Sequence, residues 1–333
     1  MRERATLSLS TYRWFAYGAL LTLVLIVFSG AAVRLTGSGL GCPTWPDCSG
    51  TFVPELDTHV WIEYGNRLFS TVVGAACLAA GLMAYQVRPR RPDLLRPATV
   101  VAAGVVAQGL LGGLTVALHL TWQVVIAHYL LSLVLLAAAA LLVWRLHHPP
   151  GETRTGERFG VLGTRVLVVY GAIVIVAGTF ATAAGPHAGG AGTGDVVERL
   201  DAFGASTLRT LIHLHGHMAT AMGIVAVGLW VAARWRGAAP ALMRALTAVC
   251  LLIAVQGIVG LVQYHNALPA EWVWVHASLP AVLWTVLVWT WLAAGRVAPV
   301  TGARSPVHPG DEAAVPERAP LEHAGLRRIV DAG

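Results

Sequence analysis

Charged residues are scarce in this chain. Only 12% of its 333 residues are Asp, Glu, Lys or Arg, whereas 56% are hydrophobic. A typical soluble domain carries about 25% charged residues. The composition therefore excludes a soluble globular domain and indicates an integral membrane protein.

The N-terminus lacks the cleavage site of a removable signal peptide. The first apolar stretch follows Arg2, Arg4 and Arg13, and no small-residue motif suited to cleavage ends it. We therefore expect a retained helix at this position.

Apolar stretches of membrane-spanning length occur eight times. Each is close to the ~20 residues that a helix needs to cross the hydrocarbon core of a bilayer. They lie at about 14–33, 62–85, 97–118, 122–144, 165–184, 209–231, 240–262 and 271–294. The pattern predicts an all-α integral membrane protein with eight transmembrane helices.

A single basic patch is also missing, which excludes nucleic acid as a partner. The formal net charge is +6, but the arginines are spread over the short loops 86–96, 145–165 and 232–244. The loops 34–61 and 185–208 carry acidic residues instead. By the positive-inside rule, the basic loops lie in the cytoplasm and the acidic loops on the outer side of the membrane.

This topology divides the chain into five segments. We expect a cytoplasmic N-terminus at 1–13, a four-helix bundle at 14–144, a cytoplasmic linker at 145–164, a second bundle at 165–294 and a disordered cytoplasmic tail at 295–333.

The two predicted bundles share a repeat with an offset of 148 residues. The segment 108–112 (QGLLG) reappears as 256–260 (QGIVG), and each copy is followed twenty residues later by a histidine, His128 or His276. An even number of helices in each half gives both halves the same orientation, related by a pseudo-two-fold axis along the membrane normal. Buried ionisable groups are costly in lipid, so histidines at matching places in membrane helices are expected to have a function. Here they indicate iron ligands.

The second helix of each half supplies the residues that face these histidines. A one-residue shift aligns Asn66 in the first half with His215 in the second. Haem iron in a helical bundle is commonly held by axial imidazoles, so His215 and His276 suit a bis-His haem. His213 and His217, spaced as i and i+4, remain alternative ligands, but no third acid or thiol supports a zinc site there.

Cysteine is rare, with four residues in the whole chain. Cys42 and Cys48 lie in the first outer loop, where their close spacing and the nearby prolines permit a small disulfide. A redox-active role of this bond stays open. Cys77 and Cys250 fall inside helices and suit apolar packing.

Glu63, at the start of the second helix, is the strongest candidate for acid–base chemistry. A buried carboxyl group near the first-half site would be able to move protons. The alternative is a structural ion pair with Arg67, one turn further on. Arg34 and Arg67, at outer helix ends, either pair with haem propionates or extend to the membrane surface.

Three segments together resemble haem A synthase of the bacterial type. They are 30–48 (GAAVRLTGSGLGCPTWPDC), 62–68 (IEYGNRL) and 274–279 (WVHASL), and the likeness extends over roughly 12–295. The resemblance implies an enzyme of the bacterial cell membrane that oxidises the C8 methyl group of haem O to the formyl group of haem A. It also implies two successive hydroxylations with oxygen derived from water.

The resemblance assigns roles to individual residues. It implies that His215 and His276 hold a haem b cofactor, that His128 binds the substrate haem, that Glu63 acts in catalysis and that Cys42 and Cys48 form the outer-loop pair. Asn66 departs from the commonest pattern of the family, which has histidine there. Partners consistent with the resemblance are haem O synthase, assembly factors of terminal oxidases and a second copy of the chain.

Two other function classes remain open at this stage. A di-haem cytochrome b that only carries electrons would have bis-His sites in both halves. In the repeat, however, Asn66 stands at the position equivalent to His215, and this difference favours an enzyme. A transporter is the second alternative, since duplicated bundles often transport solutes. The sequence shows no pair of interrupted helices to support it.

Overall fold

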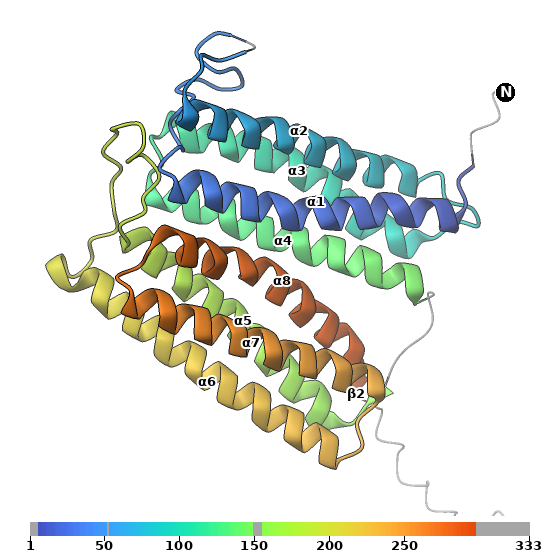
Figure 1. The fold of residues 1–333 in the computed structure, drawn as a ribbon. Helices are drawn as coiled ribbons and strands as arrows, with labels where there is room; N and C mark the ends of the chain where they lie inside the picture. The colour runs from blue at the N-terminus through green and yellow to red at the C-terminus, as the bar shows by residue number, and fades with distance from the viewer. Residues whose placement is uncertain (1–5, 52, 149–154, 298–333) are drawn as a thin grey trace, which may run out of the picture. The chain divides into compact units, whose positions relative to one another are not determined.

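The computed structural model describes residues 6–51, 53–148 and 155–297, which form eight long helices (Figure 1). The helices are α1 (Leu9–Leu35), α2 (Thr58–Ala84), α3 (Pro92–Ala117), α4 (Trp122–His147), α5 (Arg158–Ala184), α6 (Thr207–Trp235), α7 (Pro240–His265) and α8 (Ala270–Ala294). Each is long and apolar enough to cross a membrane. The predicted all-α membrane fold is confirmed.

Three short elements complete the described structure. A 3₁₀ turn, η1 (Gly204–Ser206), precedes α6, and β1 (Thr155–Gly156) pairs in parallel with β2 (Arg296–Val297). The sequence predicts a disordered tail from residue 295 onward. The structure instead places residues 296–297 in strand β2, because they pair with the chain just before α5. Residues 298–333 of that segment lie outside the described residues.

The helices form two four-helix bundles in tandem. In the first, α1 packs against α2 and α4, and α3 also packs against α2 and α4, so that α2 and α4 lie diagonally across the bundle. The same pattern in α5–α8 places α6 and α8 on a diagonal. The second and fourth helices of each half therefore face each other across the bundle interior, as do the first and third.

The two halves are joined through α8, which packs against α1 and α4 (Figure 1). Three of its tryptophans donate indole N–H bonds to backbone carbonyls of the first half. They are Trp274 to Phe28 at 2.9 Å, Trp284 to Leu133 at 2.8 Å and Trp289 to Ala140 at 2.9 Å. Trp284 and Trp289 are partly buried and Trp274 is exposed, and together the three bonds attach α8 to the first bundle.

Several helices start earlier than the apolar stretches predict. α2 begins at Thr58 instead of 62 because Asp57 caps it, accepting bonds from the N–H groups of His59 and Val60. Similarly, α5 begins at Arg158 instead of 165. Hydropathy detects only the lipid-spanning part of a helix, and at α2 the Asp57 cap extends the helix into polar sequence.

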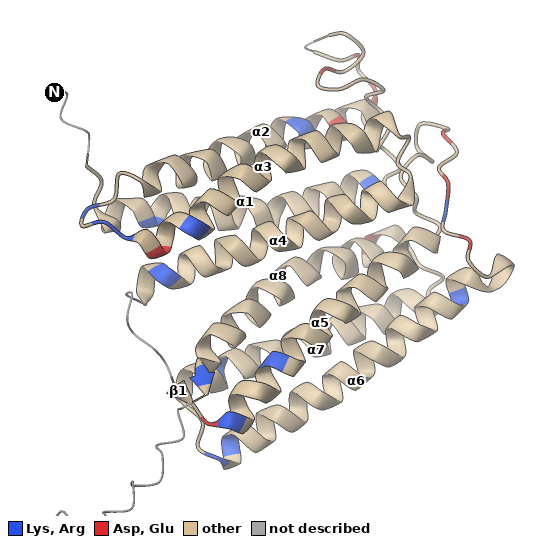
Figure 2. Ribbon diagram, turned by 180° about the vertical axis from the view of Figure 1, so that it is seen from behind, with Lys and Arg blue, Asp and Glu red and all other residues tan. Residues whose placement is uncertain are grey.

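Basic and acidic residues are separated along the helix axes. Figure 2 shows most of the blue segments at the end of the bundles where α1 begins and most of the red ones at the opposite end. The acidic end carries the two long loops, residues 36–57 (loop 1) and 185–206 (loop 5).

Loops 1 and 5 come from different halves and bind each other through glycine backbone. The Gly39 N–H donates to the Gly189 carbonyl at 2.8 Å, and the Gly192 N–H donates to the Gly37 carbonyl at 3.1 Å. A Cβ on Gly192 would overlap the His59 ring, so the close approach requires glycine. The glycine-rich sequences thus join the two halves at this end.

Candidate functional site

Two histidines meet across the interior of the second bundle. His215 on α6 and His276 on α8 have ring centroids 6.1 Å apart and ring planes at 88°. The His215 Nδ1–H donates to the Val174 carbonyl of α5 at 3.1 Å. Since the proton then resides on Nδ1, the other nitrogen, Nε2, keeps a free lone pair for a metal.

Glycines of the repeat form the surfaces on which these rings lie. A Cβ on Gly260 would lie 3.0 Å from Cε1 of His276, and a Cβ on Gly178 would lie 2.9 Å from Cε1 of His215. The Gln256 side-chain amide donates to the His276 carbonyl at 3.2 Å. The spacing of glutamine, glycine and histidine in the sequence therefore serves to position the imidazoles.

The histidine pair fits a haem better than a bare metal ion. Two imidazoles on opposite sides of one metal, with bonds of about 2 Å each, place their ring centroids roughly 6 Å apart. Nδ1 of His276 is buried without a hydrogen-bond partner among the described residues. The same residues contain no group of three His, Cys, Asp or Glu side chains able to hold a metal alone. A porphyrin would supply the remaining ligands.

His213 and His217 point away from this pair. Both are exposed, and Nε2 of His213 lies 3.1 Å from the Tyr264 hydroxyl on α7. Their rings are 6.4 Å apart. Of the three histidines at the start of α6, only His215 is brought to His276.

The first bundle repeats the framework around a single histidine. The Gln108 side-chain amide donates to the His128 carbonyl at 2.9 Å and also to the Ser132 hydroxyl. A Cβ on Gly112 would lie 3.4 Å from Cε1 of His128, and Nδ1 of His128 is buried without a partner in the described structure. The ring environment therefore matches that of His276.

The residue on the helix diagonal to the histidine differs between the two halves. Asn66 is on α2, the helix diagonal to α4, and its Oδ1 accepts a bond from the Ser29 hydroxyl of α1 at 2.8 Å. No second imidazole is paired with His128 in the described residues, in contrast to the 6.1 Å pair of the second half.

Glu63 is buried and anchored on both carboxylate oxygens. Oε2 accepts the Cys42 N–H at 2.7 Å, and Oε1 accepts bonds from Arg67 at 2.5 and 3.2 Å. The predicted ion pair with Arg67 is therefore present. Glu63 also lies one helical turn before Asn66, on the same side of α2.

Arg67 binds loop 1 as well as Glu63. Its guanidinium donates to the carbonyls of Thr44 at 2.5 Å, Asp47 at 2.7 Å and Cys42 at 2.8 Å. Arg34 donates to the carbonyls of His187 at 2.9 Å and Thr182 at 3.1 Å. Both arginines thus hold backbone, and their pairing with propionates stays a prediction that requires some of these bonds to exchange.

The structure contains the disulfide predicted for loop 1. Cys42 and Cys48 are bonded to each other and are buried, whereas Cys77 and Cys250 are free. The Cys42 N–H and carbonyl are the groups that bind Glu63 and Arg67. The disulfide therefore lies at the point where loop 1 is attached to α2.

This disulfide can be tested by alkylation. In protein purified without reductant and then denatured, we expect only Cys77 and Cys250 to be alkylated. After reduction, mass analysis should show two further alkyl groups, on Cys42 and Cys48. Denaturation is needed because both cysteines of the bond are buried. Free thiols at both positions before reduction would contradict the assignment.

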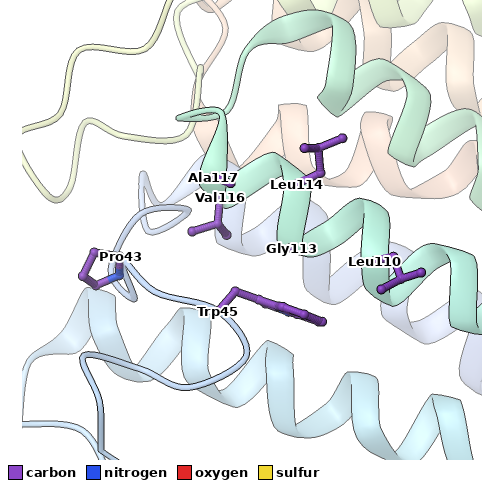
Figure 3. Close-up of a pocket in the computed structure, with 7 residues that line it drawn as sticks. All are labelled: Pro43, Trp45, Leu110, Gly113, Leu114, Val116 and Ala117. Atoms are coloured by element: carbon purple, nitrogen blue, oxygen red, sulfur yellow. The ribbon is translucent and has the colours of Figure 1, made fainter.

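Sequence reasoning missed Trp45 and the groove that it forms with α3. The groove has a volume of about 360 Å³ and is lined by Pro43, Trp45, Leu110, Gly113, Leu114, Val116 and Ala117 (Figure 3). A Cβ on Gly113 would lie 2.8 Å from the Trp45 ring. The repeat does mark this part of α3 as different between the halves, because the residue that corresponds to Gly113 in the second copy is Leu261.

Comparison with known proteins identifies relatives of this chain. The chain is 32% identical to the heme A synthase of Geobacillus kaustophilus over 125 residues, which cover 37% of this chain and 39% of that protein. It is also 32% identical to the heme A synthase of Symbiobacterium thermophilum over 169 residues, which cover 47% and 55%. These alignments span only about two fifths to just over half of the relatives. Residues 13–288, which include most of each of the eight helices, match the family described as cytochrome oxidase assembly protein. The chain therefore belongs to this family, COX15-CtaA.

Proposed function

We propose that this chain is a haem A synthase, which oxidises the C8 methyl group of haem O to a formyl group. The observation that carries the proposal is the asymmetry between two otherwise matched sites. Both halves hold a histidine on the same glutamine–glycine framework, but only the second half pairs it with another imidazole. One half is built to hold a haem firmly and the other to leave one side of a haem open.

In this proposal the second half holds the cofactor. His215 and His276 would hold haem b, which supplies one-electron redox chemistry when bound. The Val174 carbonyl keeps His215 in the tautomer that leaves Nε2 free.

The first half binds haem O in the same proposal. His128 would hold the haem, and Asn66, on the helix diagonal to that of His128, would bind iron more weakly than a second imidazole. Glu63, one turn from Asn66, is the group that takes up or releases a proton at the substrate. Arg34 and Arg67, at the same end of the first bundle, are the proposed partners of the propionates.

The proposed location is the bacterial cell membrane, with both termini in the cytoplasm. The basic loops at one end of the helices and the acidic loops at the other support this orientation. Both sites then lie near the outer face, because His128 and His276 each occupy the second turn of their helix. Haem O synthase, oxidase assembly factors and a second copy of the chain are the proposed protein partners.

Haem analysis of cells tests the proposed activity. The chain is produced in a bacterium that makes haem O but lacks its own haem A synthase, and the haems are extracted and separated. We expect haem A to appear and haem O to fall, relative to cells with an empty vector. If haem O remains unconverted while purified protein holds haem b in both halves, the chain is an electron carrier instead.

A further inference from the structure

We propose that the groove between Trp45 and α3 binds the isoprenoid tail of the substrate haem. This inference rests on the proposed function, since haem O differs from haem b by a long apolar hydroxyethylfarnesyl chain in place of a vinyl group. An enzyme that holds the porphyrin in the first bundle must also accommodate that chain.

The groove has the chemistry that such a chain requires. Every side chain that lines it is apolar, and the Trp45 indole lies alongside α3 and extends toward Leu110 (Figure 3). Leu110 and Leu114 are 63% and 44% exposed, so this face of the groove is open to the bilayer. An isoprenoid is able to enter from the lipid without crossing water.

The groove lies directly behind the His128 site. A Cβ on Gly112 would lie 3.4 Å from the His128 ring, and a Cβ on the next residue, Gly113, would lie 2.8 Å from the Trp45 ring. A Cβ on Gly109, one turn earlier, would meet no atom within 4 Å. The wall of α3 between the site and the groove therefore carries no side chains over one turn, which leaves a path for a tail.

Trp45 is held in place by the contacts already described for Arg67. The guanidinium binds the Thr44 carbonyl immediately before Trp45 and the Asp47 carbonyl two residues after it. The disulfide between Cys42 and Cys48 closes the same segment. These bonds and the disulfide hold the indole against α3, where it forms one wall of the groove.

The repeat shows that this feature belongs to one half only. Gln108, Gly109 and Gly112 have the same residue types in the second copy, but Gly113 corresponds to Leu261. Leu261 is 60% exposed on the surface of α7. The half proposed to hold haem b, which has no tail, thus lacks the glycine that admits Trp45 in the first half.

Binding measurements with two haems test the assignment. The full-length protein in nanodiscs is titrated with haem O and with haem b, which share the porphyrin but not the tail. We expect Leu110→Trp and Leu114→Trp, which fill the groove, to weaken haem O binding by about tenfold or more and to leave haem b binding unchanged. The bilayer also dissolves the tail, so the expected loss comes from steric overlap with the new side chain.

Two further variants complete the design. Leu82→Trp is the matched control, because Leu82 is also 63% exposed but lies on α2 outside the groove, and it should bind both haems as the wild type does. Gly113→Leu introduces the second-half residue and should displace Trp45, with the same selective loss of haem O. Melting temperatures show whether each variant is folded.

The outcomes separate this inference from the proposed function. Equal losses of both haems in the groove variants, or no loss of haem O in folded variants, would overturn the tail site. A wild-type protein that binds haem O selectively, and loses that selectivity in the groove variants, but never produces haem A would support the tail site and refute the proposed activity.

Discussion

Replacing either His215 or His276 with alanine should remove the low-spin haem b spectrum while leaving a folded protein. The two rings are the only imidazole pair brought together inside a bundle in the described residues, at 6.1 Å. Alanine leaves one side of the iron without a ligand, and axial ligation determines the spin state and potential of a haem. Reduced-minus-oxidised spectra of the purified variants measure the effect, and near-complete loss of the low-spin bands is expected.

His213→Ala and His217→Ala are the matched controls for this experiment. They remove the same side chain from the same helix, but both histidines are exposed and face away from His276. Their spectra should equal that of the wild type. An unchanged spectrum in both His215→Ala and His276→Ala would refute the cofactor site, and loss in a control would move the ligand to that position.

The membrane fold was largely predictable from sequence because lipid imposes simple rules. A helix that spans the bilayer must be apolar over about 20 residues, and eight such stretches correspond to the eight helices. The ends were not predictable to the same degree. Asp57 extends α2 by capping, and β1 pairs with β2 although the partner residues, such as Thr155 and Arg296, are far apart in the sequence.

The candidate site was predictable where the repeat marks it. His128 and His276 stand out because each follows the same motif by twenty residues, and the structure gives both rings the same glycine surface. The role of Arg67 in binding three loop carbonyls was not visible, since backbone acceptors leave no signature in a sequence. The contact between Gly39 and Gly189 likewise joins loops that are far apart in the chain.

Glu63→Gln should bind haem yet lose most of the oxidation activity. Glutamine preserves the size of the side chain, and its Oε1 is able to accept the bond from either the Cys42 N–H or Arg67, but not both. The three bonds from Arg67 to loop 1 carbonyls do not involve Glu63, so loop 1 should keep its attachment. What is lost is the ionisable group, together with one hydrogen bond and the ion pair with Arg67. Removal of a general acid or base typically lowers a rate by about 10²–10⁴-fold. Haem O, or a partly oxidised hydroxylated haem, should therefore accumulate in place of haem A in extracts.

Asn66→His is the contrasting variant for Glu63→Gln. It adds an imidazole across the bundle from His128, so the first-half iron should shift toward low spin while the Glu63 carboxylate remains in place. Absorption spectra and haem extraction then separate the two effects, because one variant changes ligation and the other changes proton transfer. If Glu63→Gln oxidises haem O at the wild-type rate, the carboxylate serves only to join Arg67 and the Cys42 N–H, and the acid–base role must pass to another group.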